Sequence, residues 1–172
     1  DGRPRRIVNP VGAYGGRVWF AGGKPPRPFR SPVRGHLVLG NTGIAASTGE
    51  LVAGVCKRHD ASPRLYDGYF AAIGALARDA RAALKEGELA RVGELMDGNH
   101  KLLNSIGVGH PVLDELVAIA RDAGALGAKL TGKGGGGNMV ALTEGADGQA
   151  AVAQALTEAG YTAYETAFGG AT

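Results

Sequence analysis

The sequence predicts an α+β fold in which helices cover one face of a mainly antiparallel sheet. A strand candidate near the start is followed by a long stretch with helical periodicity. Two short apolar runs then flank a glycine-rich loop, a pattern typical of paired strands, before a final helix and strand. The 172 residues are 44% hydrophobic and 20% charged, which suits one globular domain with a sizeable core, with room for an appendage.

The first 40 residues predict two strands separated by an extended connection. Residues 17–21 are a short strand candidate, and Pro25, Pro26 and Pro28 then favour extended backbone. Residues 36–40 are apolar and predict the first strand of the main sheet.

Four helices are expected next. Ser47 precedes Glu50 by three residues, as in a capping box, and predicts a helix over 48–59. Pro63 starts a second helix that ends at Gly87. A third covers 88–105, and a fourth runs from Pro111 to a stop at Gly124. The second, third and fourth helices carry apolar residues at helical spacing, at Leu65, Tyr69, Ile73 and Leu76, at Leu89, Val92, Leu95 and Met96, and at Leu113, Leu116, Val117 and Ala120.

The last third of the chain predicts strands on both sides of a glycine loop. The runs 128–130 and 139–142 are apolar, and five glycines fall within 132–137. Glycine reaches positive φ without steric cost, and successive N–H groups in such a loop can form a site for phosphate. The alternative is a merely flexible turn. A helix over 148–159 and a strand over 161–167 complete the pattern.

Two familiar nucleotide-binding motifs match this loop only by accident. Residues 127–133 satisfy G-x-x-x-x-G-K, but Gly134 stands where a Walker loop needs Ser or Thr, and a strand follows instead of a helix. The glycine run also satisfies G-x-G-x-x-G, as almost any such run does. Neither a Walker loop nor a Rossmann fold is predicted.

Five blocks in chain order resemble the GHMP small-molecule kinases, and within them the mevalonate kinases. Residues 127–142 resemble the third conserved motif of that family. The other blocks lie at 4–16, 40–55, 96–111 and 160–169. The resemblance implies a ferredoxin-like C-terminal domain over 36–172, preceded at 1–35 by a remnant of the N-terminal kinase domain and a linker.

The resemblance also implies an activity for the complete enzyme. That activity is the phosphorylation of mevalonate by ATP with Mg²⁺, in isoprenoid biosynthesis. This chain resembles only the second half of such an enzyme, so it is expected to be inactive alone. Its expected partners are the missing N-terminal half or a self-associated copy of the chain.

The same resemblance assigns candidate site residues. Those expected at phosphate are Gly132, Lys133, Gly134, Gly135, Gly136 and Gly137, and those expected at the substrate are Asn9 and Thr42. For Lys133, a solvated lysine at the loop tip is the favoured alternative. Asn9 and Thr42 could equally satisfy local backbone groups.

Val8 opposes catalysis by this chain. The catalytic aspartate of the family falls on Val8, so no catalytic residue is intact, and losing such a group commonly costs ~10²–10⁴ in rate. Two alternatives therefore stay open: a non-catalytic binding or assembly module on the same scaffold, and another GHMP kinase acting on phosphomevalonate or homoserine.

Charge, histidine spacing and cysteine content limit the partners and the cellular location that we expect. Residues 1–35 hold eight Lys or Arg against Asp1, a balance of +7, but the arginines are scattered among Pro and Gly, so no nucleic-acid partner is expected. His100 and His110 lack metal-ligand spacing, and no metal site is expected. Without an apolar run long enough to span a bilayer, and with Cys56 as the single cysteine, the sequence predicts a cytoplasmic protein with no membrane partner.

Overall fold

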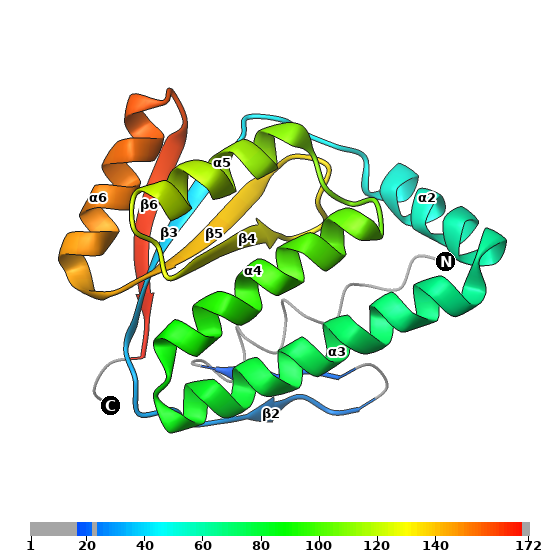
Figure 1. Ribbon diagram of the computed structural model, residues 1–172, viewed down its shortest axis with the longest axis horizontal. Coiled ribbons are helices and arrows are strands. Elements are labelled where there is room, and N and C mark those ends of the chain that lie inside the picture. The colour runs from blue at the N-terminus through cyan, green and yellow to red at the C-terminus, as the bar shows by residue number, and fades with distance from the viewer. Residues whose placement is uncertain (1–16, 22–23, 170–172) are drawn as a thin grey trace.

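The computed structural model describes residues 17–21 and 24–169, in which a four-stranded antiparallel sheet lies beside a layer of helices (Figure 1). The strands of this sheet have the order β4-β5-β3-β6. Their bounds are Gly35–Asn41 for β3, Gly127–Thr131 for β4, Asn138–Thr143 for β5 and Thr162–Phe168 for β6. The helices are Thr48–Ala61 (α2), Pro63–Glu86 (α3), Leu89–Ser105 (α4), Pro111–Asp122 (α5) and Gly145–Glu158 (α6). The predicted α+β fold is confirmed.

The main core lies between the sheet and the helices α5 and α6, which cross one of its faces (Figure 1). Val38 of β3 is opposite Ala141 of β5, which in turn is opposite Ala128 of β4, and all three side chains are fully buried. Leu113 and Leu116 of α5 have no exposed surface. Burying a leucine side chain contributes roughly 1.5–3 kcal/mol, so the apolar spacing seen in the sequence stabilises this packing directly.

The helix ends are set by local chemistry. The Ser47 hydroxyl accepts a hydrogen bond from the N–H of Glu50 at 3.4 Å and caps α2, as the sequence predicts. Gly87, with φ +89°, ends α3 in the left-handed conformation. His110 was a weak signal in the sequence, but its Nδ1 accepts the N–H of Val112 at 3.2 Å and caps α5.

The connection rich in proline forms more structure than expected. Val18–Trp19 (β1) pairs with Arg27–Pro28 (β2) in a separate two-stranded ribbon that lies against α3. Pro28 is compatible with this pairing because a two-stranded ribbon consists only of edge strands, where a missing N–H is tolerated. The helix expected at 148 also begins earlier, at Gly145.

Helix α2 lies at the end of the molecule where α3 begins, and it contacts α3 (Figure 1). None of its residues is fully buried. Among the described residues, no helix is both long enough and apolar enough to cross a membrane.

Candidate functional site

The loop 132–137 joins β4 to β5 at one end of the sheet. Its five glycines all have positive φ, between 68° and 120°, whereas no residue other than glycine has positive φ in the described ranges. Residues with a side chain rarely adopt this backbone conformation, because the β-carbon then approaches the following carbonyl oxygen. The glycines are therefore required by the path of the backbone.

The middle of the loop is also packed closely against two other segments. A β-carbon placed on Gly134 would lie 2.0 Å from the carbonyl oxygen of Val108, and one on Gly136 would lie 2.8 Å from that of Ile44. At Gly132 and Gly137, in contrast, an added β-carbon would meet nothing within 4 Å. The loop is thus clamped at its centre and open at its ends.

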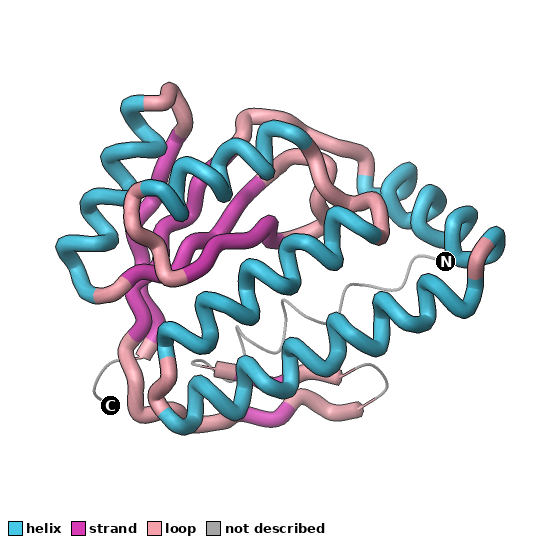
Figure 2. The backbone as a smooth tube through the Cα atoms, in the orientation of Figure 1, coloured by secondary structure: helices cyan, strands magenta, loops and turns pink. Residues whose placement is uncertain are grey.

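Backbone hydrogen bonds hold the clamp in place. The N–H of Gly135 donates to Val108 O at 2.8 Å, and the N–H of Gly137 donates to Ile44 O at 2.9 Å. Thr42 N–H donates to Gly137 O at 2.8 Å. Figure 2 shows the three loops concerned meeting at one end of the sheet. The N–H groups of Gly135 and Gly137 are occupied by protein carbonyls and are not free for a ligand.

Four other N–H groups of the loop remain. Those of Gly132, Lys133, Gly134 and Gly136 make no hydrogen bond to the residues that the structure describes. The exposed Lys133 side chain reaches back across the loop, where its Nζ donates to Ala46 O. This neutral partner leaves the positive charge of the lysine uncompensated, so it could still attract an anion.

The other candidate residues are placed unequally. Thr42 lies beside the glycine loop, but its hydroxyl accepts the N–H of Ile44 at 3.1 Å, which is the local role weighed above. Asn41 was not predicted as a site residue, but its Nδ2 donates to Asn138 Oδ1 at 2.6 Å and so joins the end of β3 to the start of β5. Asn9 and Val8 lie outside the described residues.

Comparison with known proteins identifies this domain. A family model for the GHMP kinases C terminal matches residues 80–162. The mevalonate kinase of Pyrococcus horikoshii is 44% identical over 149 residues, which cover 83% of this chain. The solved structure of L. major mevalonate kinase in complex with R-mevalonate superposes on 93% of this chain with a TM-score of 0.86 at 34% identity. The chain belongs to the GHMP kinase family.

The match covers only part of each relative. This GHMP chain spans 44% of the Pyrococcus horikoshii protein and 51% of the L. major chain. The mevalonate kinase of Pyrococcus abyssi is 42% identical over 158 residues, which are 88% of this chain and 46% of that protein. The chain therefore spans about half the length of the relatives that it matches, and the resemblance to mevalonate kinases is confirmed for that half.

Helix α4 of the GHMP domain supports the strand that leads into the glycine loop. His100 is buried, and its Nδ1 accepts the N–H of Leu130 at 3.2 Å. Its Nε2 lies 2.9 Å from Asp114 Oδ1. Since Nδ1 accepts a hydrogen bond, Nε2 carries the proton and donates to Asp114. One turn earlier, Asp97 Oδ1 accepts the N–H of Ala128 at 2.8 Å.

This support was not predicted from the sequence. Asp97 and His100 are three positions apart and share a helix face, a spacing that could have indicated a common neighbour. Their neighbour is the free edge of β4, whose alternate N–H groups would otherwise lack partners. Among the described residues, no cluster of three or more His, Cys, Asp or Glu could hold a metal ion.

Lys129 is a second cation near the loop of this GHMP domain. It lies on β4 between Ala128 and Leu130, and its Nζ donates to Leu130 O at 2.6 Å. Burial lowers the pKa of Lys129 from its ordinary value. Among the described residues, no carboxylate lies within ion-pair distance of it, so its charged form is stabilised only by backbone and solvent.

Proposed function

We propose that this domain is the C-terminal part of a mevalonate kinase-like enzyme that phosphorylates mevalonate with ATP and Mg²⁺, in isoprenoid biosynthesis. The observation that carries the proposal is the superposition on L. major mevalonate kinase in complex with R-mevalonate, with a TM-score of 0.86 at 34% identity. The 44% identity to the Pyrococcus horikoshii mevalonate kinase supports it.

The glycine loop suits the phosphate end of a nucleotide. The N–H groups of Gly132, Lys133, Gly134 and Gly136 have no acceptor in the described part of the chain, and Lys133 adds a positive charge. Bound ATP would supply the phosphoryl group, and Mg²⁺ would neutralise much of the charge on the phosphates. On this proposal, the loop residues hold and orient the phosphates, while Thr42 and Asn9 border the mevalonate.

Valine stands at the position where the resemblance predicts the group that orients the acceptor hydroxyl. In the family resemblance the catalytic aspartate falls on Val8, and valine can neither accept a proton nor carry charge. Phosphoryl transfer depends mainly on positioning and on electrostatic stabilisation, so a domain without this group and without its other half should not turn over. We therefore expect no activity from the chain alone.

A reconstitution assay tests the proposal. ADP release would be measured with the chain, with Val8→Asp, and with each of these mixed with the N-terminal half of the Pyrococcus horikoshii mevalonate kinase. Mevalonate-dependent turnover is expected only in the mixtures, and the aspartate should raise it by ~10²–10⁴. Phosphomevalonate and homoserine serve as competing substrates in the same assay.

The outcomes separate the alternatives. A preference for phosphomevalonate or homoserine over mevalonate would reassign the substrate within the GHMP kinases. Nucleotide binding without turnover in the Val8→Asp mixture would favour the non-catalytic binding module. Turnover by the chain alone would mean that its active site is built without the residue at position 8.

A further inference from the structure

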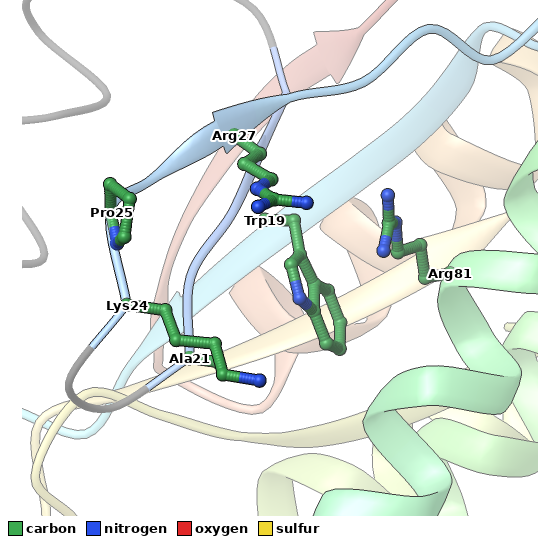
Figure 3. A pocket seen from close by; sticks show the side chains of 6 residues that line it. All are labelled: Trp19, Ala21, Lys24, Pro25, Arg27 and Arg81. Carbon is green, nitrogen blue, oxygen red and sulfur yellow. The ribbon is translucent and has the colours of Figure 1, made fainter.

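A hollow lies between the β1–β2 ribbon and α3 (Figure 3). Its volume is about 150 Å³. It is lined by Trp19, Ala21, Lys24, Pro25, Arg27 and Arg81, and contains no residue of the glycine loop. Trp19 and Arg27 are direct partners across the ribbon, and Arg81 reaches them from α3. We call this hollow the ribbon pocket.

Aromatic rings hold the guanidinium of Arg81 in the ribbon pocket. Its central carbon lies 5.0 Å from the centroid of the Trp19 ring and 5.5 Å from that of Phe29. Such contacts use the faces of the guanidinium and leave the N–H groups at its edge available for hydrogen bonds. Arg81 is thereby fixed in place without its donors being consumed.

One of those donors lacks an acceptor. The Nε of Arg81 is buried and has no hydrogen-bond partner among the described residues. A buried donor left without a partner is unfavourable, because folding removes its water without replacing it. Arg81, which lines the pocket, therefore lacks an oxygen acceptor for one of its donors.

The positive charge around the ribbon pocket also favours an anionic ligand. Lys24, Arg27 and Arg81 take part in none of the ion pairs or side-chain hydrogen bonds found between described residues. Three like charges around one cavity repel each other, and an anion between them would relieve that repulsion. In Figure 3 the charged ends of Arg27 and Arg81 lie on either side of the upper end of the Trp19 side chain, with Lys24 near its ring.

We propose that the ribbon pocket binds a small oxyanion, the phosphate group of a small molecule. The edge of the Arg81 guanidinium would donate to the oxygens, Lys24 and Arg27 would balance the charge, and Trp19 would cover the apolar side. The cavity of about 150 Å³ equals the volume of about five water molecules at about 30 Å³ each, which is room enough for a phosphate group. The site is independent of the kinase proposal, because it uses none of those residues.

Trp19 provides a direct readout, since it is the only tryptophan in the chain. Its fluorescence would be followed while the full chain is titrated with inorganic phosphate and with pyrophosphate at constant ionic strength. A saturable change is expected with both anions. The absence of a saturable change with either would overturn the proposal.

Two variants distinguish a built site from general attraction to a basic segment. Arg27→Gln should weaken phosphate binding at least about tenfold, as expected for losing a charge-assisted contact. Arg30→Gln removes the same charge from the same segment but outside the pocket, and should change affinity less than about twofold. Equal weakening by both variants would show that only net charge attracts the anion, and would overturn the site.

A third variant addresses the geometry of the donor. Arg81→Lys keeps the positive charge but loses the guanidinium fork and its Nε, so phosphate affinity should fall about as far as in Arg27→Gln. Unchanged affinity in a folded Arg81→Lys variant would contradict the role given to Arg81. If that variant does not fold, the comparison of Arg27→Gln with Arg30→Gln still decides, because both side chains are exposed.

Discussion

Two constraints, a positive φ and a lack of space for a β-carbon, can require glycine in the loop 132–137. The structure separates these two constraints at individual positions. Gly132 and Gly134 have the same φ, +82°. An added β-carbon meets nothing within 4 Å at Gly132, but at Gly134 it would lie 2.0 Å from Val108 O. The first glycine is required only by its backbone conformation, and the second is required by space as well.

Alanine at these two positions should therefore have different effects. Gly132→Ala should lower the free energy of unfolding by about 1–2 kcal/mol, the usual penalty for a side chain in the left-handed region. Gly134→Ala should cost a further 1–3 kcal/mol or so, because Val108 must move. Denaturant unfolding of both variants measures the difference, and equal losses would mean that the Val108 contact is absent in solution.

The hydrogen bonds of His100 fix which of its two ring nitrogens carries the proton. Its Nδ1 accepts from Leu130 N–H, and its Nε2 donates to Asp114. We expect ¹⁵N NMR at neutral pH to show a protonated Nε2 and an unprotonated Nδ1. His100→Ala should destabilise the domain by roughly 2–3 kcal/mol, because the N–H of Leu130 is left buried and unpaired. Lys101→Ala, at the exposed next position, is the control, and should stay within about 0.5 kcal/mol of the parent.

The sequence predicts which loop residues are special but not which of their donors are free. Glycine content alone indicated positive φ, and that prediction holds at all five positions. The direction of each N–H depends on where Ile44 and Val108 lie, and those positions follow from packing between segments far apart in the chain. Whether the residues of the loop 132–137 contact phosphate stays a prediction.

Between elements, α4 and the start of β4 cross with their backbones in close contact. A β-carbon on Gly93 would lie 2.2 Å from Leu126 O, and one on Gly127 would lie 2.0 Å from Gly93 O. The two backbones approach this closely because neither residue has a side chain. The approach brings Asp97 and His100 within reach of the β4 edge.

Two alanine substitutions on α4 should have opposite signs. Gly93→Ala should destabilise the domain by at least about 2 kcal/mol, since backbone atoms must separate. Gly98→Ala lies on the same helix, where the nearest atom to an added β-carbon is a Leu76 methyl at 3.6 Å. It should stabilise by about 0.5–1 kcal/mol through helix propensity. Thermal unfolding of the pair checks this, and destabilisation by Gly98→Ala would contradict the packing described.

The junction between α2 and α3 should respond to pH. His59 of α2 lies 3.0 Å from Asp67 of α3, and this hydrogen bond is the main reason why the pKa of His59 is raised above 6.5, with a smaller contribution from Asp60. A raised folded-state pKa favours the folded state below pH 6.5, and that stabilisation is lost as the pH rises through the raised value.

An NMR titration tests this junction. His59 should titrate above 6.5 in the parent chain, and Asp67→Asn should bring its pKa back toward 6.5. In the same variant, the part of the stability that falls with rising pH through this range should shrink. A His59 pKa that is unaffected by Asp67→Asn would mean that the two helices do not make this contact in solution.

Most helices and strands could be predicted from the sequence, and those that were missed depend on packing between distant segments. Helix ends coincide with Ser47, Pro63, Gly87 and Pro111, because capping and backbone restrictions act locally. The pairing of β2 with β1 was missed, since its residues carry no alternating pattern and the ribbon depends on the surface of α3. Support of β4 by Asp97 and His100 was likewise invisible before the helix and strand were placed together.

At the scale of the whole molecule, the order of the strands in the sheet could not be predicted from any single residue pattern. The order β4-β5-β3-β6 places the first strand of the main sheet in its interior and the last at its edge. Nothing in the apolar run at 36–40 distinguishes an interior strand from an edge strand. The division of the chain at residue 35 stays a prediction, although β3 begins at that residue.

The interior position of β3 has a consequence for how the chain is made. Both neighbours of β3, the strands β5 and β6, are synthesised after four helices have been added. The ribosome adds about 5–20 residues per second, so β3 waits for seconds with both edges unpaired, while α2 to α5 can form from local contacts. Hydrogen bonds also join the segment after β3 to Gly137 in the glycine loop. These bonds can form only after residue 137 has left the ribosome, so the loop acquires its shape late in synthesis.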